Sequence, residues 1–67
     1  MEVRVIMKRL NGKWYVVTGT PEDICDKVAQ HYHTDNVQCV FIDGATVWSA
    51  LGTEHRLTLR ELRGFFQ

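Results

Sequence analysis

The sequence predicts an α+β protein, a single two-layer domain with the element order β-β-α-β-β-α and a mainly antiparallel four-stranded sheet. Two dipeptides that favour tight hairpin turns, Asn11-Gly12 and Asp43-Gly44, each lie between segments rich in apolar or β-branched residues. Between these two predicted hairpins, apolar residues recur at helical spacing from 24 to 32. Because 67 residues leave room for only one core, we expect one small domain over residues 1–67.

The first hairpin is predicted over residues 3–18, with Asn11-Gly12 as a two-residue type I′ turn. In that register Met7 faces Val16, and alternate residues of each strand point to opposite sides of the sheet. The predicted core side carries Val3, Val5, Met7, Trp14 and Val16. The predicted opposite side carries Arg4, Ile6, Lys8, Leu10, Tyr15 and Val17.

The first helix is predicted to begin at Thr20-Pro21. A threonine can cap the first backbone N–H groups, proline suits the first helical position, and the acidic pair that follows favours the positive end of the helix dipole. Its predicted core-facing residues are Ile24, Cys25, Val28, Ala29 and Tyr32. We expect it to end near His33, before the turn-forming residues 34–36.

The second hairpin is predicted from strands at 37–42 and 45–49, joined by Asp43-Gly44. The nearly unbroken apolar run of 37–42 indicates a central strand covered on both faces. A two-residue turn places Phe41 opposite Thr46 and Cys39 opposite Trp48. We favour the sheet order 2-1-3-4, with the first helix crossing one face; the third strand beside the second is the alternative.

Residues 50–57 are predicted as a loop, although the alternation of apolar residues also permits a short strand at 55–59. A short C-terminal helix is predicted to begin at Thr58, because Thr58 and Glu61 have the spacing of a capping box. Gly64 is expected to end this helix as its C-terminal cap.

The composition indicates what the chain is attracted to and where it is located. Eight basic and eight acidic residues cancel, so the whole chain has no net field that would attract nucleic acid or an anionic membrane. No apolar run approaches the ~20 residues of a membrane helix, and the charged N-terminal segment does not resemble a signal peptide. We therefore expect a soluble, cytoplasmic protein.

The sequence contains no strong catalytic or metal-binding motif. The spacing of the cysteines and histidines contains no Cys-x-x-Cys or His-x-x-x-His pair, so we expect reduced core thiols, no metal and no cofactor. No nucleophile-base pair or glycine-rich phosphate loop is evident, and we predict that the chain is not an enzyme. The potential ligands considered are Cys25, His31, His33, Cys39 and His55. The sequence also contains a basic cluster that acidic residues interrupt, formed by His55, Arg56, Arg60 and Arg63. This pattern favours a solvated helix face with local ion pairs.

The second side of the first hairpin carries four large apolar side chains, more than a solvent-exposed sheet face normally holds. Either the C-terminal helix covers this side, or it contacts another protein or a second copy of the chain. For the contact surface, the predicted anchors are Ile6, Leu10, Tyr15 and Val17, with Arg4 and Lys8 at the rim. On this interpretation Tyr15→Ala should leave the fold intact and weaken association.

The size, neutral charge and hairpin-helix-hairpin plan are similar to those of many small phage or mobile-element proteins that inhibit or redirect a host machine. This resemblance covers no alignable motif and assigns no functional residue. It favours a non-enzymatic inhibitor or adaptor that binds a host protein complex, and a homodimer is compatible with that function. The alternative is a sheet-face binder of single-stranded nucleic acid, in which Arg4, Lys8 and Lys13 surround the ring of Tyr15.

Overall fold

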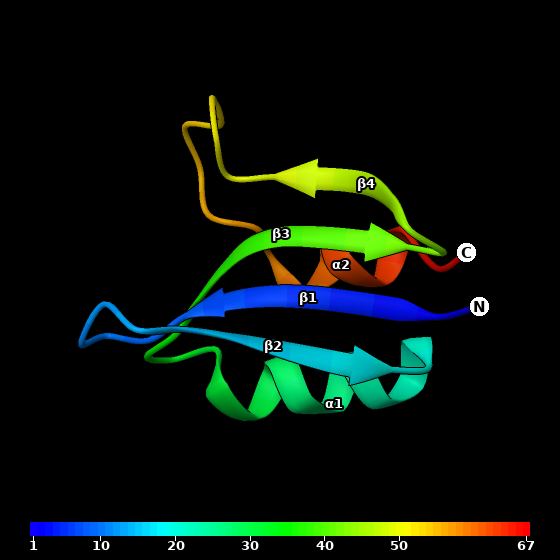
Figure 1. The fold of residues 1–67 in the computed structure, drawn as a ribbon, viewed down its shortest axis with the longest axis horizontal. Coiled ribbons are helices and arrows are strands. Elements are labelled where there is room, and N and C mark those ends of the chain that lie inside the picture. Colours follow the sequence, from blue (N-terminus) through cyan, green and yellow to red (C-terminus); the bar gives the residue numbers. More distant parts are fainter.

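Four antiparallel strands form one sheet in the order β2-β1-β3-β4 (Figure 1). The structure is a computed structural model that describes residues 1–67. The strands are β1 (Val3–Lys8), β2 (Trp14–Gly19), β3 (Asn36–Ile42) and β4 (Ala45–Ser49), and the helices are α1 (Pro21–His31) and α2 (Leu59–Gly64). The predicted fold class, element order and favoured strand order are confirmed.

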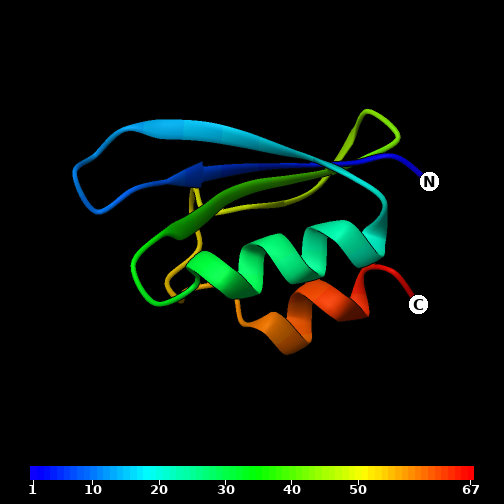
Figure 2. The ribbon, with the colours of Figure 1, turned by 90° about the horizontal axis from the view of Figure 1, so that it is seen from below.

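Both helices lie on the same side of the sheet (Figure 2). The core between the two layers consists of Val3, Val5, Met7, Ile24, Val28, Val37, Val40, Leu57 and Leu62. The other side of the sheet is the open face, which no helix covers. Its side chains, assigned by the strand registers, are those of Glu2, Arg4, Ile6, Lys8, Trp14, Val16, Thr18, Asn36, Cys39, Phe41, Thr46 and Ser49. The alternative in which the C-terminal helix covers the second side of the first hairpin is therefore wrong.

Capping boxes define the start of each helix. The Thr20 hydroxyl accepts from the Asp23 N–H at 3.3 Å, and the Asp23 carboxylate accepts from the Thr20 N–H at 3.4 Å. Thr58 and Glu61 make the same reciprocal pair at α2, with both backbone bonds at 3.1 Å. Gly64 is the last helical residue and Phe65 is the C-cap, so the prediction of a glycine cap after α2 is wrong by one position.

The turn of the first hairpin differs from the prediction. The Gly12 N–H donates to the Arg9 carbonyl at 2.9 Å, and the Arg9 N–H donates to the Lys13 carbonyl at 2.7 Å. Gly12 has a φ of 89°, whereas Asn11 is not in the positive-φ region that a type I′ turn requires. The connection is therefore a three-residue loop over 10–12, in which the Asn11 side-chain oxygen accepts from the Lys13 N–H at 3.0 Å.

The extra loop residue shifts the register of β1 against β2 by one. Met7 faces Tyr15 instead of Val16, and Ile6 faces Val16. Because side chains alternate along a strand, a shift of one residue exchanges the two faces of β2. Trp14 and Val16, predicted in the core, are 60% and 54% exposed on the open face, and Tyr15 packs against the core instead. Val17, also predicted on the second side, joins Tyr15 against the core.

The second hairpin has the predicted two-residue turn, with φ of 49° at Asp43 and 86° at Gly44. Phe41 lies opposite Thr46, as predicted. A bulge then inserts one residue into β4, so Trp48 faces Val40 rather than Cys39 and packs on the core side. The prediction that β3 is covered on both faces is also wrong, because Cys39 and Phe41 lie on the open face.

The segment between β4 and α2 forms no additional strand, so the loop prediction for residues 50–57 is confirmed. Leu57, near the end of this segment, is buried in the core, while Leu51 near its start is 91% exposed. No helix of the structure has the length and apolar character needed to cross a membrane.

Candidate functional site: the open sheet face

An apolar strip crosses three strands of the open face. It consists of Trp14, Val16, Ile6 and Phe41. Ile6 and Val16 are direct cross-strand partners, Phe41 lies opposite Arg4, and Trp14 lies opposite Lys8. Ile6 and Phe41 are half-buried by their neighbours, whereas Trp14 and Val16 are mostly exposed. The strip thus offers a continuous apolar surface on a rigid sheet.

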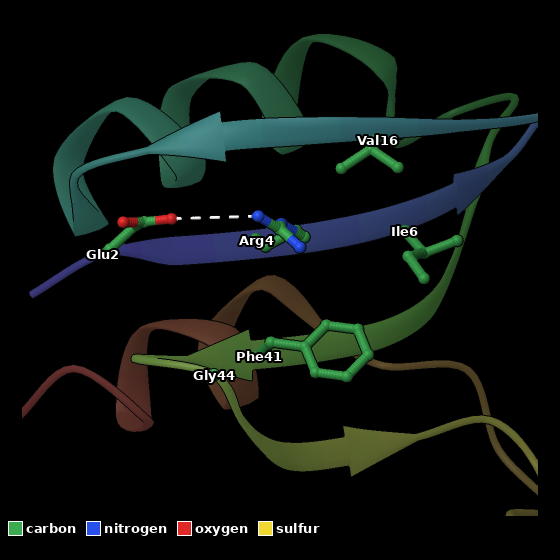
Figure 3. A pocket seen from close by; sticks show the side chains of 6 residues that line it. All are labelled: Glu2, Arg4, Ile6, Val16, Phe41 and Gly44. Carbon is green, nitrogen blue, oxygen red and sulfur yellow. Dashed lines mark ion pairs between the residues drawn. The ribbon is translucent and has the colours of Figure 1, made fainter.

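One end of the strip is hollowed. A cavity of about 370 Å³ is lined by Glu2, Arg4, Ile6, Val16, Phe41 and Gly44. Figure 3 shows the lining side chains, with Arg4 between Glu2 and Ile6 along β1, Val16 on β2 and the Phe41 ring on β3. The Arg4 guanidinium lies 3.9 Å from the Glu2 carboxylate, and both side chains are largely exposed. An apolar side chain of a binding partner could enter here beside a charged group.

The other end of the strip borders a second hollow of about 490 Å³. It is lined by Trp14, Gln38, Cys39, Ser49, Ala50 and Leu51. Leu51 projects from the loop after β4 and extends the apolar surface beyond the sheet edge. The open face therefore has apolar contact area along its whole length, with two depressions and few charges.

The six residues predicted as a partner-binding set do not form one surface. Arg4, Ile6 and Lys8 lie on the open face together, but Leu10 lies in the turn and is 83% exposed. Tyr15 and Val17 pack on the helix side, so their predicted place on the contact surface is wrong. The sequence interpretation missed Trp14, Val16 and Phe41. Reading Leu10-Asn11-Gly12 as a three-residue loop ending in glycine would have found the first two.

Tyr15 instead belongs to a polar cluster at the edge of the core. Its hydroxyl donates to the carboxylate of Asp35, which is the only charged residue among the buried ones, at 7% exposure. The Thr34 hydroxyl also donates to this carboxylate, at 3.0 Å, and the Arg9 guanidinium lies 4.7 Å from the centre of the Tyr15 ring. This cluster ties the first hairpin to the segment between α1 and β3, and it excludes Tyr15 as a free stacking platform.

Arg56 makes a second connection of this kind. Its guanidinium lies 3.9 Å from the centre of the Tyr32 ring and donates to the Tyr32 carbonyl and, at 3.0 Å, to the Asp35 carbonyl. The Tyr32 hydroxyl donates in turn to the Leu57 carbonyl at 2.7 Å. Arg56 therefore fastens the loop before α2 to the end of α1. In the sequence analysis it was grouped with His55, Arg60 and Arg63 as one basic cluster, but its role is structural. Within that cluster, the His55 ring lies 3.2 Å from the Glu61 carboxylate, and His55 and Arg56 belong to the loop before α2 rather than to a helix face.

The Tyr15–Asp35 pair predicts a pH dependence of stability at both extremes. Burial, followed by the hydrogen bond to Asp35, raises the pKa of Tyr15 from 10.0 to about 12. The hydrogen bond from Tyr15 is the main cause that lowers the pKa of Asp35 below its ordinary 3.8. The neutral phenol stabilises the fold below pH 10, and this contribution is lost as the pH rises from 10 to 12. The ionised carboxylate stabilises the fold above about pH 4, and this contribution is lost as the pH falls further.

Thermal unfolding of the protein and of Tyr15→Phe across these two pH ranges would measure this effect. We expect the difference in Tm between the two proteins to be largest near neutral pH and to shrink at both extremes. The variant lacks the hydrogen bond between Tyr15 and Asp35, and in the unsubstituted protein this bond is lost when either group titrates. A difference that stays constant from pH 3 to pH 11.5 would contradict the assignment.

Metal-ligating and nucleophilic side chains are dispersed in the structure. No group of three or more His, Cys, Asp or Glu side chains is arranged to hold a metal ion. Cys25 and Cys39 are free thiols on opposite sides of the sheet, and both are half-buried. Comparison of the chain with protein-family models, with curated proteins and with solved structures gave no match. The open face is therefore the feature from which a function has to be inferred.

Proposed function

We propose that the chain is a non-enzymatic protein-binding module that contacts its partner through the open face. The observation that carries this proposal is the apolar strip, which crosses three strands and is covered by no part of the chain. Contiguous exposed apolar surface rimmed by polar residues is typical of protein interaction sites. A sheet face is also rigid, so little conformational entropy is lost when it binds.

The strip contains the residue types that dominate binding energy at interfaces. Trp14 and Phe41 supply large aromatic contact area, and Arg4 and Lys8 lie at its rim, where charges steer association and select partners. A module of 67 residues with such a face acts by occupying a surface of its partner. An inhibitor or adaptor function, as in small phage or mobile-element proteins that act on host complexes, is the proposed outcome of that occupancy.

Val16→Glu tests the open face directly. The substitution places a charge in the middle of the strip, on an exposed position of an edge strand, so the fold should be retained. We expect at least a tenfold loss in the capture of partner protein by the immobilised chain from a lysate of the host cell, because a desolvated charge would face an apolar contact. The matched control is Leu10→Glu, which introduces the same charge at an exposed residue outside the open face.

Equal capture by Val16→Glu and the unsubstituted chain, with both proteins folded by circular dichroism, would contradict the proposal. Binding of a thymidine oligonucleotide that weakens steeply with salt, and that Lys8→Ala reduces, would instead favour single-stranded nucleic acid as the ligand, with Trp14 as the stacking ring.

A further inference from the structure

The outer edge of β2 presents unpaired backbone groups. β2 lies at one end of the sheet, so only one of its sides has a neighbouring strand. In an antiparallel pair, residues that exchange backbone hydrogen bonds alternate with residues that do not. The Arg9 N–H donates to the Lys13 carbonyl at 2.7 Å, so the residues of β2 that bond to β1 are Tyr15, Val17 and Gly19. The N–H and C=O groups that point to the free edge are those of Trp14, Val16 and Thr18.

Two further hydrogen bonds agree with this direction. The Lys27 ammonium, on α1, donates to the Thr18 carbonyl at 3.4 Å, which places that carbonyl at the free edge. On the other side of β1, the Glu2 carbonyl accepts from the Asp43 N–H at 2.9 Å. Alternate residues of β1 from Glu2 therefore face β3, and the residues between them bond to β2.

This edge also lacks the features that usually prevent pairing with another chain. Edge strands are commonly blunted by charged residues, proline or a bulge. β2 contains none of these over its six residues, and its register with β1 is regular. The opposite edge strand, β4, is shorter and carries a bulge. Because α1 lies along β2 on the helix side (Figure 1, Figure 2), a strand added to this edge would have α1 beside it.

The charge around this edge is positive. The first hairpin, residues 3–19, contains no acidic residue and four basic ones, which are Arg4, Lys8, Arg9 and Lys13. Arg4 and Lys8 lie across from the two ends of β2, and Lys27 contacts it from the helix side. Two acidic residues lie nearby, but Glu2 pairs with Arg4 at 3.9 Å, and Asp23 accepts from the backbone at the start of α1 at 3.4 Å. The surroundings of the free edge therefore favour an acidic strand.

We propose that the partner protein contributes an extended acidic segment that pairs antiparallel with the outer edge of β2 and continues the sheet. The inference rests on the proposed function, since the added strand would lie beside Trp14 and Val16 and enlarge the open face. A second copy of this chain fits the edge less well, because its β2 brings the same cations. Nucleic acid has no backbone in which N–H donors and C=O acceptors alternate.

The two sides of the added strand would meet different surroundings. Residues opposite Trp14 and Val16 place their side chains on the open face, beside two mostly exposed apolar side chains. Residues between them point to the helix side, where the Lys27 ammonium lies at the edge of β2. The segment that fits this edge therefore alternates apolar residues on the open-face side with acidic residues on the helix side.

A blocked seven-residue peptide in which valine and glutamate alternate is the probe, and amide hydrogen exchange by NMR is the measurement. We expect the peptide to slow exchange at Trp14 and Val16 by about tenfold or more, because their N–H groups become hydrogen-bonded. Tyr15 and Val17, whose N–H groups bond to β1, are the internal references. The same peptide with N-methylated valines keeps every side chain but loses the donors that face β2, and it should bind about tenfold more weakly. Lysine in place of glutamate should also weaken binding about tenfold.

Val16→Pro tests the backbone of β2 itself. It removes the N–H that points to the free edge, and proline is tolerated in an edge strand at such a position. We expect about tenfold weaker peptide binding by this variant with the fold retained by circular dichroism. The matched control, Val16→Ala, loses apolar surface but keeps the N–H, and it should bind within about threefold of the unsubstituted chain. If Val16→Pro does not fold, the comparison of the peptide with its N-methylated form decides the question.

Several results would overturn the inference. One is exchange at Val16 that millimolar peptide does not slow, and another is equal binding of the peptide and its N-methylated form. Slowed exchange at Val16 that depends on protein concentration without any peptide would make a second copy the occupant. A chain that ignores the peptide but loses partner capture in Val16→Glu would overturn the edge pairing and leave the proposed function standing. A chain that shows neither effect would overturn both.

Discussion

Tyr15→Ala is expected to lower the free energy of unfolding by about 2–3 kcal/mol, because truncation removes a half-buried aromatic ring and the donor to a buried carboxylate. The ring packs against the core, and its hydroxyl is bonded to Asp35. This expectation reverses the one drawn from the sequence, in which Tyr15 lay on the contact surface and its removal left the fold intact. The difference arises entirely from the one-residue shift of β2.

Urea unfolding followed by circular dichroism would measure the loss, with two further variants as references. Tyr15→Phe keeps the ring and removes the hydroxyl, so about 1 kcal/mol should be lost. Leu10→Ala changes an 83% exposed side chain in the adjacent turn and should change the stability by less than about 0.5 kcal/mol. If Tyr15→Ala unfolds at the same urea concentration as Leu10→Ala, Tyr15 does not contribute to the core.

Leu62→Ala is expected to cost about 3 kcal/mol or more. Leu62 is the buried residue of α2 and is 1% exposed within the core cluster, so its truncation leaves a cavity beneath the sheet. A domain of this size has a total stability on the order of 3–5 kcal/mol. The variant should therefore be substantially unfolded at 25 °C or should melt at least 15 °C below the unsubstituted protein.

The amide exchange of α2 and the melting temperature would report this loss, and Leu51→Ala serves as the control because Leu51 is 91% exposed. A Leu62→Ala variant that keeps the parent melting temperature would show that α2 contributes little to the core. In that case the six-residue helix would be held only by its capping box and the neighbouring aromatic residues.

The architecture was predictable because its signals are local and agree with one another. Pro21 at the first helical position, the Thr58–Glu61 capping box and the Asp43-Gly44 turn each specify one element boundary, and the structure uses all three. The tendency of consecutive elements to be neighbours accounts for the β1-β2 and β3-β4 pairs, whereas α1 carries the chain from β2 across one face of the sheet to β3. None of these inferences depended on which side of β2 faces the core.

The faces of β2 and the end of β4 were not predictable with the same rules. Both Trp14-Val16 and Tyr15-Val17 are apolar pairs, so hydrophobic alternation does not select the buried one. The three-residue loop, in which the Asn11 side-chain oxygen accepts from the Lys13 N–H, goes with the register that buries Tyr15 and Val17. The bulge in β4 is likewise set by packing, because it brings Trp48 onto the core side. The candidate site was consequently placed on the correct side of β1 and the wrong side of β2.

The three-residue loop has a consequence for how sequences related to this one could diverge. Since β2 is apolar on both sides, its six residues encode two alternative surfaces, and the length of the preceding loop decides which is displayed. Loss or gain of one residue between 9 and 13 would exchange the displayed and the buried sets without a change at any position of the strand. Variation in loop length is thus a route by which descendants of this chain could acquire different binding partners while they retain the same fold.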